Sequence, residues 1–405
     1  MTVAYRAHWV LPIVSPRVTR GWVHLDRGRI LAVGGPGEAT PAGIDVVDLG
    51  RVAILPGLVN AHTHLELSWM ADRVPPASAM PAWAAALVSL RATAGPDPVP
   101  PIEDAIRGAR TAGTALAGDV TNTLASYKPL ADSRLAAAIF RELLGFNSPD
   151  PQRLVADARR QLDGLGPLDR LRPFIAPHAP FSVSPELFRA IARQAGTGPL
   201  SVHLAESAEE IQFLRDGTGA WRDLLGRLGA WNERWAAPGC GPVEYLDRLG
   251  LVSRALMAVH CVHATDGDLQ RLSAARATVV TCPRSNRWTG AGTPPIERFY
   301  ASGVRVAIGT DSLASVEDLN LFAELAEVRR LAPSVPAARL LESATRHGAD
   351  ALGFGAEFGT IEPGKRADLI AVSVPSAVED VEEYLVRGIE PPSIQWVGEP
   401  EEARP

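Results

Sequence analysis

The sequence predicts an α/β protein: a parallel β/α barrel accompanied by a small β module made from both chain ends. Two observations favour this fold. Between residues 56 and 355, short apolar runs alternate about eight times with longer Ala-, Leu-, Arg- and Glu-rich stretches, as repeated β–α units do. Residues 1–55 and 356–405 lack this alternation and consist of short β-rich runs and turns. An open doubly wound sheet is the alternative for the central region.

The terminal module is predicted from local patterns at both ends. VTRGWVHLDRGRILAVGG alternates polar and apolar residues around a turn at residues 26–28, which is a hairpin signal. VDLGRVAILPG is similar and stops at Pro56-Gly57. Near the other end, FGTIEPGKRADLIAVSV has Gly and Pro turns between β-rich runs. We therefore expect one β domain from residues 1–55 plus 356–405, and a catalytic barrel from residues 56–355.

The barrel elements follow in order along the chain. Eight strands are expected, in the segments VNAHTHLE, TALAGDV, LAAAIFREL, LRPFIAP, LSVHLAE, ALMAVHCV, ATVVTCP and VRVAIGTD. Clear helical patterns include SPELFRAIARQA, DGDLQRLSAAR and DLNLFAELAEVRRL. Ser184 and Asp266 precede two of these helices as expected N-caps, the first with Pro185 at the first helical position.

Composition excludes several classes of protein. The 405 residues are 46% hydrophobic and 21% charged, which is globular rather than disordered or fibrous composition. A net charge of −6 argues against a nucleic-acid binder. Three scattered cysteines cannot make a disulfide framework or a four-cysteine zinc module. The sequence has neither a membrane-length apolar run nor a signal-peptide pattern, so no membrane partner and a cytoplasmic location are expected.

The strongest chemical signal is the pair His62 and His64. Residues two apart on a strand face the same side, so both imidazoles can converge on one ion. His203, His260 and Asp311 each follow an apolar run, at the expected carboxyl end of a barrel strand. Barrel enzymes carry their catalytic residues at that end. The five positions together predict a metal site rather than five separate structural side chains.

Glu206 lies three residues after His203, on the turn expected to follow the strand. A carboxyl group there can carry protons between a bound water and a substrate nitrogen. His263 follows His260 by three residues, and we interpret it as a supporting or structural residue.

With these residues in place, the chain resembles the amidohydrolase superfamily, in its branch of amino-heterocycle deaminases and chlorohydrolases. The matching segments span almost the whole chain in the expected order: LPGLVNAHTHLELS, HAPFSVSPELF, SVHLAES, AVHCVHATDGDL, CPRSNRWTG, AIGTDSLAS, ATRHGADALG and GTIEPGKRADLIAV. The resemblance implies a distorted (β/α)8 TIM barrel with a small β-sandwich domain built from both chain ends.

The resemblance also implies roles for individual residues. It implies one divalent metal ion, zinc or alternatively iron, held by His62, His64, His203 and Asp311. Glu206 matches the acid/base of an HxxE motif, whereas His260 and Asp311 match residues that orient or deprotonate the attacking water. Three further positions match residues that line the substrate pocket in this branch: His178, Ser285 and Asn286.

The implied reaction is hydrolytic deamination of an amino-substituted heterocycle, with release of ammonia. The other deaminase type needs H-x-E together with P-C-x-x-C. His64-Leu65-Glu66 supplies the first string, but P-C-x-x-C is absent from the sequence. Triazine dechlorination and amide or N-acyl hydrolysis by the same activated water remain alternatives. A metal-free binding protein is the alternative of another class, although all five expected positions are present.

The barrel rim suggests a small-molecule substrate. The string NAHTHLELS, with Glu66 after the metal pair, is most similar to bacterial 6-aminodeoxyfutalosine deaminases, which serve menaquinone biosynthesis. Adenosine, S-adenosylhomocysteine, guanine and cytosine stay open as substrates. Arg141 is the candidate for binding a substrate carboxylate, with a surface pair to Glu142 as the alternative. Trp83 is a candidate for stacking on a purine, with ordinary packing as the alternative. By analogy with relatives, the chain could form a homodimer.

Lysine is scarce: of 40 basic residues only Lys128 and Lys365 are lysines. The resemblance implies that two-metal members of the superfamily bridge their ions with a carboxylated lysine on the fourth barrel strand. The expected fourth strand, LRPFIAPHAP, contains no lysine. The sequence therefore favours a single-metal site.

Overall fold

The computed structural model describes residues 2–398 except residues 41, 94, 96, 97, 167 and 197, so the last seven residues of the predicted terminal domain lie outside it. In the described part, no helix combines the length and the apolar character that a membrane span requires.

Eight parallel strands form the centre of the molecule, in two four-stranded sheets. The first sheet, in spatial order, contains β6 (Leu58–Thr63), β7 (Thr114–Thr121), β8 (Ala136–Leu143) and β9 (Leu171–Pro177). The second contains β10 (Leu200–Leu204), β11 (Leu256–His260), β12 (Thr278–Thr281) and β13 (Arg305–Ile308). All eight expected strand segments are therefore confirmed.

Backbone hydrogen bonds join the two sheets near the carboxyl ends of their strands. The His203 amide donates to the His178 carbonyl over 2.9 Å, and the Thr310 amide donates to the His62 carbonyl over 3.1 Å. The strands are almost entirely buried, as expected when helices cover a parallel sheet.

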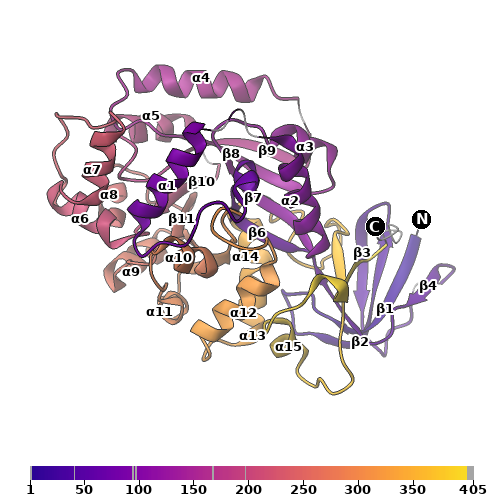
Figure 1. Cartoon of the computed structure of the whole chain (residues 1–405). Helices are drawn as coiled ribbons and strands as arrows, with labels where there is room; N and C mark the ends of the chain where they lie inside the picture. The colour runs from indigo at the N-terminus through magenta and orange to yellow at the C-terminus, as the bar shows by residue number, and fades with distance from the viewer. Residues whose placement is uncertain are drawn as a thin grey trace.

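Helices surround the strands (Figure 1). In chain order they are η1 (Leu65–Met70), α1 (Met80–Thr93), α2 (Val99–Thr111), α3 (Tyr127–Asp132), α4 (Pro151–Asp163), α5 (Pro185–Ala195), α6 (Ala208–Asp216), α7 (Ala220–Arg227), α8 (Pro242–Arg248), α9 (Asp266–Ala274), α10 (Pro283–Thr289), α11 (Ile296–Ala301), α12 (Leu321–Leu331), α13 (Ala337–Ser343), α14 (Arg346–Ala351), α15 (Val381–Leu385) and η2 (Pro391–Ser393).

One of the two predicted helix caps is confirmed and the other is wrong by one residue. Ser184 caps α5, with Pro185 as the first helical residue. The cap of α9 is Thr265, not Asp266, which is the first residue of the helix. The hydroxyl of Thr265 accepts from the Asp268 amide, and the Asp268 carboxylate accepts from the Thr265 amide. This reciprocal capping box satisfies two amides, whereas a cap at Asp266 would leave them unpaired.

Strands from both chain ends form one further sheet, seen beside the barrel in Figure 1 with both termini. Its strands are β1 (Thr2–Val10), β2 (Val18–Asp26), β3 (Arg29–Gly34), β4 (Asp45–Asp48), β5 (Val52–Pro56), β14 (Leu369–Ser373) and β15 (Ile394–Trp396). β14 pairs with β5 and β15, and β1 pairs with β2 and β5. Strands from both chain ends thus pair in one sheet, as expected, whereas the β-sandwich arrangement and the domain boundaries remain predictions.

Candidate metal centre and active site

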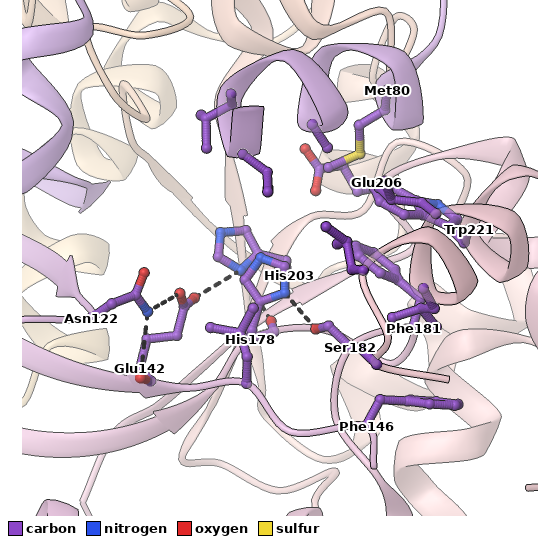
Figure 2. Close-up of a pocket in the computed structure, with 18 of the residues that line it drawn as sticks. Met80, Asn122, Glu142, Phe146, His178, Phe181, Ser182, His203, Glu206 and Trp221 are labelled. Carbon is purple, nitrogen blue, oxygen red and sulfur yellow. Dashed lines mark hydrogen bonds and ion pairs between the residues drawn. The ribbon is translucent and has the colours of Figure 1, made fainter. Parts of the chain in front are cut away.

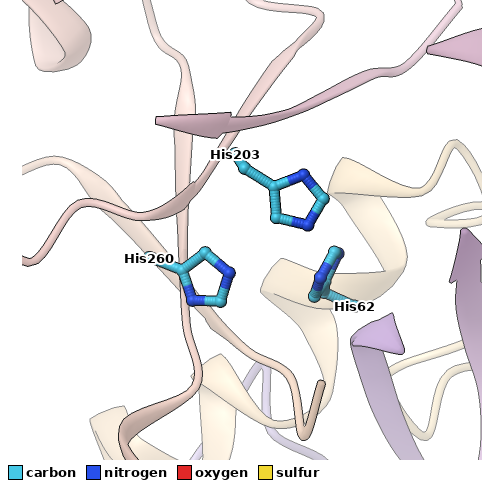
Figure 3. A group of neighbouring side chains, drawn as sticks. All are labelled: His62, His203 and His260. Carbon is cyan, nitrogen blue, oxygen red and sulfur yellow. The ribbon is translucent and has the colours of Figure 1, made fainter. Parts of the chain in front are cut away.

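The strand ends bring the predicted metal ligands together. His62, at the end of β6, lies beside His203 of β10 and His260 of β11, and Figure 3 shows the three rings facing one another. The Nε2 atoms of His62 and His64 are 3.2 Å apart. Asp311 Oδ1 lies 3.6 Å from His64 Nε2 and 3.9 Å from His62 Nε2.

The backbone at these strand ends takes an unusual conformation. Ala205, His260 and Asp311 have φ values of 50°, 73° and 64°, in the left-handed region that side chains other than glycine rarely adopt. Such strain concentrates at functional sites. Gly309 allows the chain after β13 to approach His62 closely, since a Cβ at Gly309 would lie 2.8 Å from the His62 carbonyl oxygen.

These donors fit a divalent metal ion. Ligands about 2.1 Å from a tetrahedral zinc are separated by about 3.4 Å, close to the separations among His62, His64 and Asp311. Burial lowers the pKa of His62, and neighbouring histidines lower it further, so the ring is in the neutral form that binds metals. Burial also lowers the pKa of His203 to about 4. The nitrogen Nε2 of His260 is buried without a hydrogen-bond partner in the described structure.

A second layer of contacts orients these side chains. The Ser285 hydroxyl donates to Asp311 Oδ2 over 2.6 Å. His203 Nδ1 lies 3.0 Å from the His178 carbonyl oxygen, which leaves Nε2 for a metal. The side-chain amide of Asn286 lies 2.9 Å from Nδ1 of His260. Ser285 and Asn286 thus act on the site through other side chains, and neither residue lines the cavity.

Glu206 is the buried acid of the site. Its Oε1 lies 3.4 Å from His260 Nε2, and its Oε2 is buried without a partner among the described residues. Burial raises the pKa of Glu206 well above its ordinary value, and the carboxylates of Asp311 and Glu210 raise it further. Glu210 accepts from the amides of Ala205 and Glu206, which fixes the turn that carries Glu206. Burial thus favours the protonated form of this carboxyl group, which is the form that can donate a proton to a ligand.

A cavity of about 510 Å³ opens above these residues (Figure 2). His64, His203, Glu206, His260 and Asp311 line its inner end. Aromatic and aliphatic side chains make most of the remaining wall: Leu67, Met80, Trp83, Leu87, Val88, Leu144, Phe146, Phe181, Trp221, Leu224, Leu225 and Leu228. An apolar cavity with convergent polar groups at one end is typical of a small-molecule site.

The predicted rim residues are distributed unevenly. Trp83 and His178 line the cavity. Glu66 does not, because its buried carboxylate accepts from Thr121, from Thr123 and from Arg91. Glu66 thus ties η1 to the loop after β7 and to α1.

The structure places Arg141 outside the cavity, in contrast to the expectation for a carboxylate-binding residue. Its guanidinium donates to Gln161 of α4 and to the backbone carbonyl of Glu142. Because successive strand residues face opposite sides, it is the neighbouring Glu142 that lines the cavity.

The lining residues that were not singled out as site residues from the sequence include Arg91, Asn122 and Glu142. Arg91 pairs with Glu66 over 2.9 Å and donates to Asn122 over 3.0 Å. Asn122 in turn donates to Glu142 over 2.8 Å. Successive side chains in the FREL segment of β8 point to opposite faces of the sheet, and this alternation could have identified Glu142. Arg91 could not be found in this way, because tertiary packing determines where its helix, α1, lies relative to the cavity.

Comparison with known proteins decides the family. The model of the amidohydrolase family matches residues 53–387. This chain belongs to the amidohydrolase family. As an amidohydrolase it is a metal-dependent enzyme that hydrolyses C–N bonds, and its barrel has the TIM-barrel type of fold.

Two curated relatives are similar over most of the amidohydrolase chain. The 5-methylthioadenosine/S-adenosylhomocysteine deaminase of Moorella thermoacetica is 31% identical over 412 residues, covering 94% of this chain and 89% of that protein. The aminodeoxyfutalosine deaminase of Deinococcus radiodurans is 34% identical over 315 residues, covering 74% of this chain and 73% of that protein.

Two solved structures share the fold. Aminofutalosine deaminase of Helicobacter pylori in complex with methylthio-coformycin has a TM-score of 0.85 and 25% identity, covering 95% of each chain. An adenosine deaminase from Xanthomonas campestris with bound zinc has a TM-score of 0.82 and 26% identity, covering 97% of this chain and 90% of that one.

The two lysines lie away from the expected bridging position. Lys128 is in α3, and Lys365 precedes β14, where its ammonium contacts Gly355 and Glu362. The fourth barrel strand, β9, contains no lysine. The single-metal arrangement remains a prediction that these positions favour.

Proposed function

We propose that this amidohydrolase is a hydrolytic deaminase of an adenine nucleoside, with 6-aminodeoxyfutalosine as its first candidate substrate. The observation that carries the proposal is the buried carboxyl group of Glu206 beside His260, at the inner end of a cavity that can enclose a purine. Relatives named aminodeoxyfutalosine deaminase and methylthioadenosine/S-adenosylhomocysteine deaminase support the adenine nucleoside.

A divalent ion, zinc in our proposal with iron as the alternative, would be held by His62, His64, His203 and Asp311. Such an ion would supply Lewis-acid chemistry, lowering the pKa of the attacking water from 15.7 towards about 7. Glu206 donates its proton to the ring nitrogen next to the amino-bearing carbon, so negative charge does not accumulate on the desolvated ring. His260 and Asp311 orient the attacking water and accept its proton. The proton taken up by His260 and Asp311 passes to the amino group, which leaves as ammonia, and the remaining hydroxyl proton returns to Glu206 as the C–O double bond forms.

A second candidate substrate, 5-methylthioadenosine, is favoured by the outer part of the cavity. Leu144 and Leu228 line it and are 48% and 50% exposed, as suits an apolar substituent. The one cation among the described lining residues, Arg91, is already paired with Glu66. A substrate carboxylate would have to share that cation with Glu66.

Ammonia release from the metal-loaded enzyme tests the proposal. The panel comprises 6-aminodeoxyfutalosine, 5-methylthioadenosine, S-adenosylhomocysteine, adenosine, guanine and cytosine. We expect turnover of adenine nucleosides, and the ratio of kcat/KM between the first two compounds ranks them. Cleavage of N-acyl amino acids without ammonia from any aminoheterocycle would contradict the proposal.

A further inference from the structure

Glu142 is a buried carboxylate that faces the cavity and has no part in the proposed chemistry. It lies at the end of β8 and is 4% exposed. Figure 2 shows Asn122 and His203 beside it. Asn122 donates to Oε2 over 2.8 Å. Oε1 lies 3.5 Å from His203 Nδ1, but that nitrogen is closer, at 3.0 Å, to the His178 carbonyl oxygen.

The carboxylate of Glu142 is therefore incompletely satisfied by the protein. An ionised carboxylate can accept about four hydrogen bonds, and among the described residues only Asn122 is positioned to donate one to it. A buried polar group with unused capacity is costly unless a ligand or water completes it. Since Glu142 lines the cavity, a ligand can supply the missing donors.

The imidazole of His178 lies beside it. Glu142, His178 and His203 each have a side-chain N or O atom within 4.8 Å of the others. His178 Nδ1 lies 2.5 Å from the Ser182 hydroxyl, which itself donates to the Ala179 carbonyl. Ser182 thus engages the Nδ1 side of the His178 ring, which leaves Nε2 to contact a ligand.

We infer that Glu142, with His178 beside it, accepts hydrogen bonds from the vicinal hydroxyl groups of the substrate's ribose. The free acceptor capacity of the Glu142 carboxylate matches two adjacent hydroxyl donors. The inference rests on the proposed nucleoside substrate. It assigns Glu142 to selecting ribonucleosides over deoxynucleosides, whereas Glu206 and the metal ligands act on the base.

Substrate analogues combined with a variant test this inference. Wild type and Glu142→Gln are compared on 5-methylthioadenosine and on its 2-deoxyribose and 3-deoxyribose analogues, with metal content measured for each protein. Glu103→Gln, the same change at an exposed position of α2, is the control.

We expect Glu142→Gln to lower kcat/KM for the ribonucleoside about 10- to 100-fold, as for loss of a hydrogen bond to a charged group. The metal content of the variant should equal that of wild type. The analogues should already be poor substrates of wild type and should lose little more in the variant.

The other possible results would contradict the role of Glu142 in ribose binding or the proposed function. Equal kcat/KM for ribose and deoxyribose substrates in wild type would overturn the inference even if the variant fails to fold. An equal loss on all substrates, with reduced metal content, would make Glu142 a positioning residue for His203 instead. A second bound metal equivalent that is lost in Glu142→Gln would assign Glu142, His178 and His203 to a cation. Absence of turnover of any adenine nucleoside would contradict the proposed function itself.

Discussion

At the scale of single residues, Glu206 is the group whose protonation matters most. It is 2% exposed, lies 3.4 Å from His260, and has its pKa raised well above the ordinary value by burial. The four proposed metal ligands do not include it. Its role in proton transfer can therefore be separated from metal binding by substitution.

Glu206→Gln keeps the shape of the side chain and removes its acidic proton. We expect kcat to fall about 10²-fold or more, the usual scale for a general acid or base, because the ring nitrogen then has no proton donor. Metal content, measured by elemental analysis, should stay at the wild-type level. Near-normal turnover with intact metal content would show that Glu206 is not the acid.

Ser285 acts through Asp311. Its hydroxyl donates over 2.6 Å to Oδ2, the oxygen opposite the one that lies near His62 and His64. We expect Ser285→Ala to weaken metal affinity about 10- to 100-fold, as outer contacts to metal ligands commonly do. Competition with a chelator measures this affinity. Ser302→Ala, the same change at the end of α11, is the control. A lower melting temperature with unchanged metal affinity would assign Ser285 a structural role only.

At the scale of elements, strand ends and helix caps determine where side chains point. The proposed metal ligands follow apolar strands whose ends meet, so the proximity of these side chains was predictable from the sequence. The cap of α9 was misplaced because Thr265 and Asp266 are both good capping residues. Only the backbone conformation distinguishes them, since Thr265 has an extended conformation and accepts from the Asp268 amide.

Substitution at the two candidate caps of α9 distinguishes them energetically. Thr265→Ala should lower the free energy of unfolding by about 1 kcal/mol, the usual contribution of an N-cap. Asp266→Ala removes an exposed pair with Arg298, and such pairs contribute less than about 1 kcal/mol and often nothing measurable. Urea unfolding of the metal-loaded proteins gives both values, and Thr265→Ser should retain most of the stability. A larger loss for Asp266→Ala than for Thr265→Ala would contradict the assigned cap.

At the scale of the whole molecule, sequence reasoning predicted what local patterns determine. Eight apolar runs predicted the barrel strands, and the polar residues after them predicted the cluster of His62, His203, His260 and Asp311. Arg141 and Glu142 show the limit: they are neighbours on β8, and only the sheet's orientation decides which one faces the cavity. Arg91 shows another limit, because α1 reaches the cavity through contacts between segments far apart in the chain, including its pair with Glu66.

Burial of acids also makes the stability of the whole molecule depend on pH. Glu324 on α12 is fully buried, and its Oε1 lies 3.8 Å from Arg284 of α10. Burial raises the pKa of Glu324 from 4.5 to about 8, although Arg284 lowers it in part. Arg284 also pairs with Glu317 and Asp318, which compete for its charge.

The direction of this effect follows from proton binding. Between pH 4.5 and about 8 the folded state keeps a proton on Glu324 that the unfolded state has lost. Stability therefore falls as the pH rises through this window, by at most about 1.4 kcal/mol per pH unit for one group. Above the folded-state pKa the contribution of Glu324 to stability is constant.

Glu324→Gln removes this titration while keeping a side chain of the same size. The stability of the variant should therefore fall less than that of wild type between pH 5 and pH 8. Urea-unfolding midpoints at several pH values measure the difference, and other buried acids cancel because both proteins contain them. Parallel curves for the two proteins would mean that Glu324 is ionised in the folded state, with Arg284 as its effective counter-ion.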